Sequence, residues 1–235
     1  MKCWRNALAL TLVSVSLFVS GCAKKMAAPP PPPESIVGND FLQESLFKGD
    51  QAVLSNQDID RILTARITLA DRHRLAVLCL NSRSRWYEDV ADIETQNSEQ
   101  FLKALRSASQ LTQVRLMPTL LIPERRTVPY LREAAARFQA DLLLVYAAGY
   151  QTFQRDRMLS ADEVKAQSKI ESVLLDVRTG IVVDSVETSE IVTAKKAPGD
   201  LNFSQTIAKA QAEAAGKALL KLADAVVGFV QAAER

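Results

Sequence analysis

From residue 55 onward, the chain alternates between segments of helical and of strand periodicity, and this order restricts the fold more than any other feature. Apolar residues spaced by three and four predict helices, and short runs rich in valine, isoleucine and leucine predict strands. The predicted helices span residues 55–68, 96–109, 127–141 and 204–233, and the predicted strands span residues 74–80, 114–122, 141–153, 169–177 and 181–192. Such alternation is typical of an α/β domain.

The last two predicted strands flank the tripeptide "RTG", whose Gly180 can adopt the left-handed conformation of a hairpin turn. A short helical turn is expected before them, at residues 160–167, because Ser160 and Glu163 have the spacing of a capping box. We therefore predict an α/β fold: a three-layer sandwich with a central mixed sheet, a late antiparallel hairpin and a long C-terminal helix.

The N-terminus has the pattern of a processed secretory segment. Lys2 and Arg5 precede an apolar run at residues 7–19, which two small residues and Cys22 follow. A spanning helix needs roughly 20 apolar residues, so this run is too short for one. Its ending resembles the bacterial lipobox, in which the cysteine is lipidated and the chain is cut before it. We predict a lipoprotein signal peptide at residues 1–21, with a diacylglyceryl group and an N-acyl chain such as palmitate on Cys22.

The residues after Cys22 predict how the protein is held at a membrane. Two or more acyl chains give stable anchoring, and Ala23, by resemblance to diderm lipoproteins, implies the periplasmic face of the outer membrane. Five prolines at residues 29–33 favour an extended spacer. We expect a lipidated proline-rich linker at residues 22–50 and a single periplasmic α/β domain at residues 51–235.

Composition and motifs exclude several classes of function. Of 29 Lys and Arg residues, Lys2 and Arg5 leave with the signal, and the remaining 27 balance 27 Asp and Glu residues, so no basic footprint for nucleic acid is expected. No nucleophile elbow, phosphate-binding loop or zinc motif is present. His73, the only histidine, is expected in an exposed loop, and Cys79 is expected to be a small buried residue. We predict no enzyme activity, no metal and no cofactor beyond the lipid on Cys22.

Two aromatic pairs are candidate partner-binding residues. Trp86 and Tyr87 stand before an acidic segment, and Tyr150 and Phe153 lie in the polar second half of a predicted strand. Exposed aromatic residues are enriched at binding hot spots, but covering the core is the alternative for Trp86 and Tyr87.

Three segments carry a resemblance to a known family: "HRLAVLCLNSRS", "AARFQADLLLVYAAGYQTF" and "ESVLLDVRTGIVVDSVETS". They resemble periplasmic lipoproteins similar to the curli secretion channel subunit (CsgG-like), whose relatives include polysaccharide-export and peptidoglycan-synthase-activator lipoproteins. The resemblance implies a three-layer α/β fold and a role as scaffold, accessory subunit or regulator in cell-envelope assembly or export, with an envelope protein as partner. A periplasmic carrier of a small or lipidic ligand stays open as the alternative, as does homo-oligomerisation.

Overall fold

A computed structural model describes residues 35–40, 46, 55–65, 72–81, 87–155 and 163–233, with the backbone alone for 35–40 and 154–155. The chain divides into two units, Met1–Pro32 and Pro33–Arg235, and every described residue belongs to the second. The signal peptide, Cys22 and Trp86 lie outside the described residues, so the predictions made for them stay predictions.

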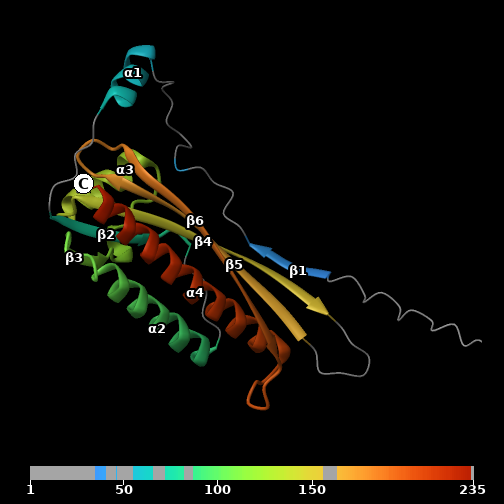
Figure 1. The fold of residues 1–235 in the computed structure, drawn as a ribbon. Coiled ribbons are helices and arrows are strands. Elements are labelled where there is room, and N and C mark those ends of the chain that lie inside the picture. Colours follow the sequence, from blue (N-terminus) through green and yellow to red (C-terminus); the bar gives the residue numbers. More distant parts are fainter. Residues whose placement is uncertain are drawn as a thin grey trace, which may run out of the picture. The chain divides into compact units, whose positions relative to one another are not determined.

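Six strands and four α-helices make up the described part of the second unit (Figure 1). The strands are β1 (Ser35–Asp40), β2 (His73–Cys79), β3 (Leu111–Leu116), β4 (Leu142–Arg155), β5 (Glu163–Asp176) and β6 (Val182–Lys195). The helices are α1 (Asn56–Thr64), α2 (Glu88–Leu105), α3 (Val128–Arg137) and α4 (Phe203–Ala232), with a single 3₁₀ turn, η1 (Thr119–Leu121), between β3 and α3.

The strands form one mixed sheet in the order β3-β2-β4-β5-β6. Strands β3, β2 and β4 are parallel neighbours, whereas β4, β5 and β6 form an antiparallel meander. One edge of β4 pairs with β5 along its whole length. Its other edge is shared, because β2 pairs with residues 142–146 and β1 pairs with residues 150–154 (Figure 1).

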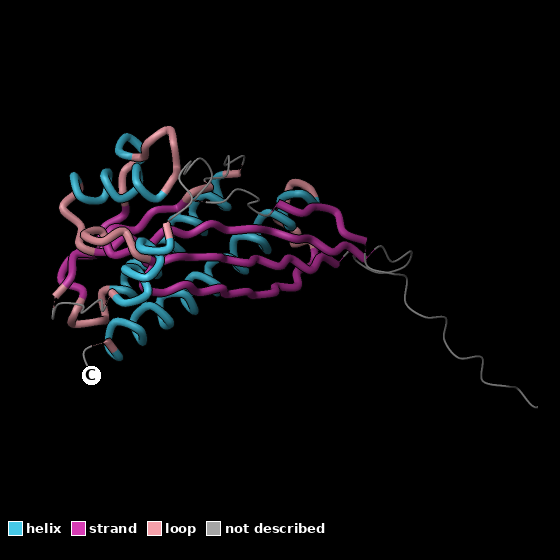
Figure 2. Tube along the Cα trace, turned by 90° about the horizontal axis from the view of Figure 1, so that it is seen from above, coloured by secondary structure: helices cyan, strands magenta, loops and turns pink. Residues whose placement is uncertain are grey.

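Helices cover both faces of the sheet, because successive residues of a buried strand point to opposite sides. Leu142 and Leu144 belong to a core cluster with side chains of α2 and α4, while Leu143 and Val145 belong to a second cluster with side chains of α3. Figure 2 shows the long strands and the helices that accompany them along much of their length. The predicted α/β three-layer sandwich with its long C-terminal helix is confirmed.

Helices α2 and α4 lie side by side on the sheet and pack closely at Gly216. A Cβ atom at Gly216 would lie 2.2 Å from Oδ1 of Asn97, so only glycine fits without moving that side chain. The same amide donates from Nδ2 to the carbonyl oxygen of Ala212 at 2.8 Å, which ties α2 to α4. Within the described residues, no helix combines the length and the apolar character needed to cross a bilayer.

The turn between β5 and β6 has the predicted conformation. Gly180 has φ +77°, the left-handed region that favours glycine. Its N–H donates to the carbonyl oxygen of Asp176 at 2.8 Å, and the carboxylate of Asp176 accepts from the N–H of Thr179 at 3.1 Å. The hairpin prediction is therefore confirmed.

The helical turn predicted at residues 160–167 is wrong where the structure describes it. Glu163 already begins β5, and buried Val164 and Ala166 alternate with exposed Lys165. This period of two buries one face of β5 against α4, so sheet pairing overrides the local capping signal. Helix α2 begins at Glu88, before the predicted residue 96. Its acidic first turn suits the positive end of a helix dipole.

Two further differences concern the beginning of the domain. Strand β1 lies within residues 22–50, where the sequence predicted only linker, and its backbone pairs with β4. His73 was expected in an exposed loop, yet it begins β2 and is 5% exposed. Its backbone N–H donates to the carbonyl oxygen of Gln110 at 2.7 Å, which extends the sheet by one residue beyond the predicted start.

Candidate functional site

In the half of the meander formed by β4, β5 and β6 that α3 leaves uncovered, the sheet is buried on one face only. Residues that pair directly in antiparallel strands share a face, so the register assigns each side chain to a side. On the side of α4, the residues Thr152, Val164, Ala166, Ser168 and Val192 are all buried. We call the other side the open face; it carries Phe153, Lys165, Gln167, Lys169, Glu171, Glu187, Ser189, Ile191 and Thr193, each exposed or half-buried.

The open face is polar, with one exposed apolar residue near the sheet edge. Ile191 is 54% exposed and pairs with Gln167, whose Nε2 donates to Oγ of Ser189 at 2.9 Å. Lys169 bridges two carboxylates, with Nζ 2.7 Å from Glu171 and 2.9 Å from Glu187. These carboxylates raise the pKa of Lys169 and fix its ammonium group.

Strand β6 is the last strand of the sheet order, so among the described strands only one of its edges is paired, with β5. From Asp184 to Lys195 its register with β5 is continuous, and the strand contains no proline. Within the described part of the chain, its outer edge therefore has the unpaired backbone groups that allow another strand to be added.

Of the three predicted partner-binding residues that the structure describes, Phe153 alone lies on the open face. Tyr150 is three positions earlier in β4 and points to the other side, where it packs half-buried against the cluster under α2 and α4. Ile191 was missed, although adjacent Ile191 and Val192 in a polar strand required one apolar side chain to face outward.

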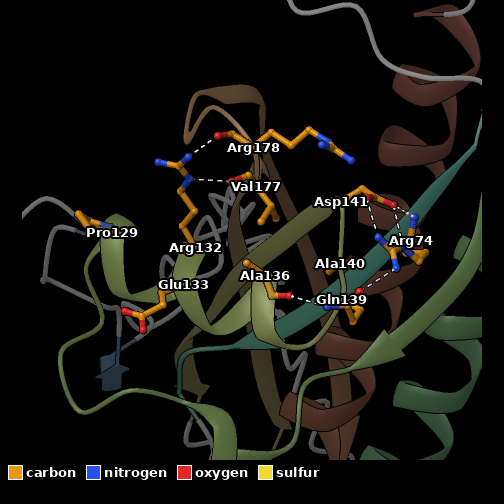
Figure 3. Close-up of a pocket in the computed structure, with 10 residues that line it drawn as sticks. All are labelled: Arg74, Pro129, Arg132, Glu133, Ala136, Gln139, Ala140, Asp141, Val177 and Arg178. Carbon is orange, nitrogen blue, oxygen red and sulfur yellow. Dashed lines mark hydrogen bonds and ion pairs between the residues drawn. The ribbon is translucent and has the colours of Figure 1, made fainter.

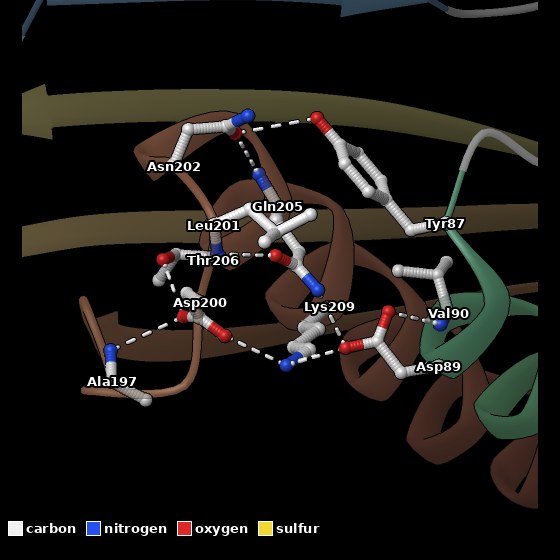
Figure 4. A network of polar contacts seen from close by, with 10 residues as sticks. All are labelled: Tyr87, Asp89, Val90, Ala197, Asp200, Leu201, Asn202, Gln205, Thr206 and Lys209. Carbon is white, nitrogen blue, oxygen red and sulfur yellow. Dashed lines mark hydrogen bonds and ion pairs between the residues drawn. The ribbon is translucent and has the colours of Figure 1, made fainter.

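Tyr87 lies elsewhere, at the start of α2, in a polar network that joins α2 to α4 (Figure 4). Its hydroxyl donates to Oδ1 of Asn202, the N-cap of α4, at 3.2 Å. Nearby, Gln205 donates from Nε2 to the carboxylate of Asp89 at 2.7 Å. Tyr87 therefore contributes to a structural contact, and the three described candidates do not form one patch.

Asp200 is the centre of this network. Its carboxylate accepts from the N–H of Ala197 at 3.1 Å, from the hydroxyl of Thr206 at 2.6 Å and from Nζ of Lys209 at 2.7 Å. Lys209 also lies 2.6 Å from the carboxylate of Asp89. The hydrogen bond from Lys209 is the first cause that lowers the pKa of Asp200, to about 2. One ammonium group thus bridges two carboxylates, and the network holds the loop after β6 against the starts of α2 and α4.

The remaining groups give little support to catalysis. Burial raises the pKa of the Cys79 thiol, which donates to the carbonyl oxygen of Asn81 at 3.1 Å, so the nucleophilic thiolate is disfavoured. Among the residues that the structure describes, no group of three His, Cys, Asp or Glu side chains could hold a metal ion.

Comparisons with known proteins give remote likenesses only. No family model and no curated protein sequence matches the chain. The PelC dodecamer from Paraburkholderia phytofirmans is 18% identical, with a TM-score of 0.34 and coverage of 72% of this chain and 94% of that chain. The minor lipoprotein from Acinetobacter baumannii is 11% identical, with a TM-score of 0.33 and coverage of 70% and 93%.

The LpoB C-terminal domain from Salmonella enterica is 16% identical, with a TM-score of 0.28 and coverage of 56% of this chain and 90% of that chain. The likeness to the curli secretion channel subunit stays a prediction from sequence. Because these identities lie below 20% and the TM-scores below 0.5, the chain is assigned to no family, and its function has to follow from its own residues.

Proposed function

We propose that this chain is a non-enzymatic lipoprotein, anchored to the periplasmic face of the outer membrane through Cys22, whose α/β domain binds an envelope protein. The partner contributes an extended segment that adds a strand to the outer edge of β6. The observation that carries the proposal is the combination of this long edge with the open face beside it.

The side chains on the two faces of β6 differ in how available they are to an added strand. On the side of α4, Thr188 donates to the carbonyl oxygen of Ala218 at 2.9 Å and Glu190 pairs with Lys221 at 2.5 Å, so these side chains already have partners. On the open face, Ile191 is exposed next to the edge. Backbone pairing gives affinity in this binding mode, while alternate side chains give specificity. The partner segment is therefore expected to place an apolar residue beside Ile191.

The alternative of a ligand carrier has less support from the packing. The space between the sheet and helices α2 and α4 is filled by buried side chains such as Phe101, Leu144 and Leu222, which are at most 2% exposed. The rings of Phe101 and Tyr146 meet edge to face with their centroids 5.7 Å apart. A ligand held there would have to displace well-packed core side chains.

The anchor is tested by replacing Cys22→Ser and fractionating cells. The unaltered chain is expected to sediment with outer membranes and to exceed the mass of its processed polypeptide by two or three acyl chains, whereas the variant is released from the membrane. An unaltered chain without added mass would refute the lipid anchor.

The binding edge is tested by in-cell photo-crosslinking from a benzoylphenylalanine introduced in place of Ser189. We expect one adduct of defined mass. Ile191→Lys should abolish it, because a lysine on an edge strand blocks strand addition. Leu120→Lys should retain it, because Leu120 is 95% exposed and lies beyond β3 at the opposite edge of the sheet.

Two outcomes would overturn the binding proposal. An adduct of twice the chain mass would mean that a second copy occupies β6, and the absence of any adduct above background would mean that the edge is not used in cells.

A further inference from the structure

A cavity beside the turn between β5 and β6 is lined by three arginines (Figure 3). Its volume is about 430 Å³, and its walls come from β2, from α3, from the chain entering β4 and from the turn between β5 and β6. Arg74, Arg132 and Arg178 lie on different walls, so the fold brings together three cations from distant parts of the sequence.

The two carboxylates on the cavity wall are already paired. Asp141 accepts from Nε of Arg74 at 3.0 Å and from Nη2 at 2.9 Å, and this pairing is the first cause that lowers the pKa of Asp141. Glu133 pairs with Arg137 at 2.6 Å. Neither carboxylate is therefore left to neutralise the other two arginines by direct contact.

Arg132 is held in place by neutral groups. Its Nε donates to the carbonyl oxygen of Val177 at 2.6 Å, and its Nη2 donates to that of Arg178. Gly180 makes room for this side chain, because a Cβ atom there would lie 3.2 Å from Cδ of Arg132. Carbonyl oxygens orient a guanidinium group without cancelling its charge, and the group has five N–H donors, so further donors remain.

Arg178 supplies a second cation, whose charge acts on the Asp141 carboxylate without a direct contact and helps to lower the pKa of that group. Within the described part of the chain, its guanidinium group makes no hydrogen bond and no ion pair, and its backbone oxygen is the atom that Arg132 contacts. In Figure 3 this side chain extends from the hairpin toward Asp141 and Arg74. The cavity thus combines one fixed guanidinium group with one that can close over a ligand.

We propose that this cavity binds an oxyanion, a phosphate or carboxylate group, through Arg132 and the exposed side chain of Arg178. Guanidinium groups match both anions in geometry and form charge-assisted hydrogen bonds with them. The Asp141–Arg74 pair forms the opposite wall and fixes Arg74, so the positive charge that faces the anion comes from the other two arginines. The anion is either a soluble ion or the headgroup of an anionic lipid.

The experiment uses the full chain purified in a neutral detergent and isothermal titration calorimetry with three probes: inorganic phosphate, acetate and a short-chain phosphatidic acid. We expect saturable binding of phosphate or acetate that weakens as salt is added. Tighter binding of phosphatidic acid than of phosphate would identify a lipid headgroup as the ligand, and equal binding would identify the soluble ion.

Arg178→Gln should weaken binding about tenfold or more, because it removes one charge-assisted contact. This exposed side chain makes no hydrogen bond or ion pair within the described residues, and solvent screens its charge interaction with Asp141, so the variant should melt like the unaltered protein. Lys103→Gln, which removes an exposed positive charge from α2, is the matched control and should leave binding unchanged. Absence of saturable binding for all three probes, or equal affinity of the Arg178→Gln variant, would overturn the proposal.

Discussion

The side chain of Asn81 occupies the position of a strand residue beside Ala148. Its Nδ2 donates to the carbonyl oxygen of Ala148 at 2.6 Å, and its Oδ1 accepts from the N–H of Ala148 at 3.0 Å. Just before it, the N–H of Leu80 donates to the carbonyl oxygen of Tyr146 at 2.9 Å, and just beyond it β1 begins to pair at Tyr150. One carboxamide thus fills the gap between two strands that share the same edge of β4.

Replacing Asn81→Ala should lower the free energy of unfolding by about 1–3 kcal/mol, because it leaves two backbone groups of buried Ala148 without partners. Urea denaturation of the two proteins measures the difference. Asn56→Ala, at an exposed position in α1, should change stability by less than about 0.5 kcal/mol. Equal stability of the Asn81→Ala variant and the parent would show that water replaces the carboxamide.

The close contact between Gly216 and Asn97 predicts that Gly216→Ala has opposite effects on stability in the presence and absence of the Asn97 side chain. Alone, Gly216→Ala should destabilise the domain by about 1–3 kcal/mol, because the new methyl group displaces the Asn97 amide from its bond to Ala212. In an Asn97→Ala background the same change should stabilise it by about 1 kcal/mol, since alanine is the better helix former. A double-mutant cycle by thermal denaturation tests this coupling. Additive effects would contradict the close approach of α2 and α4.

Ser168 is fully buried in β5, and its hydroxyl has no hydrogen-bond partner within the described part of the chain. Burying an unpaired hydroxyl costs free energy, so Ser168→Ala should raise the free energy of unfolding by about 1 kcal/mol. Ser185→Ala, at an exposed position of β6, is the control and should have no measurable effect. A loss of stability in Ser168→Ala would reveal a partner for the hydroxyl, such as an ordered water molecule.

The loss of unfolding free energy at acidic pH should depend on Asp200. Its pKa is about 2 in the folded protein and 3.8 for the unperturbed side chain, so between these values the unfolded chain binds more protons. The contribution of this carboxylate is therefore complete above about pH 4 and is lost as the pH falls toward 2. Urea denaturation should show a large difference between the parent and Asp200→Asn near neutral pH that shrinks below about pH 4. A difference independent of pH would contradict the network.

The sequence predicted the order of most elements because their periodicities are long and regular. The apolar spacing in α3 and α4 and the glycine of the hairpin act locally, so they can be read without the fold. Strand β1 could not be predicted, because its pairing depends on an edge of β4 that β2 leaves uncovered. The start of β5 was misread because pairing with two neighbouring strands outweighs a local capping pattern.

The candidate site was less accessible to sequence reasoning. Tyr150 and Phe153 were grouped by proximity in the chain, but an odd separation in a strand places side chains on opposite faces. The open face depends on which half of the sheet α3 leaves uncovered, and the arginine cavity depends on three segments that meet only in the fold. Neither has a signature within one stretch of sequence.

Strand β1 also determines how the domain would respond to a mechanical load. It is the described segment nearest to Cys22, so tension transmitted from a moored N-terminus would reach its ladder with β4 first. That ladder is short and is interrupted between Ile36 and Gly38. We expect it to detach before the five remaining strands separate, which would lengthen the tether while the body of the protein stays folded.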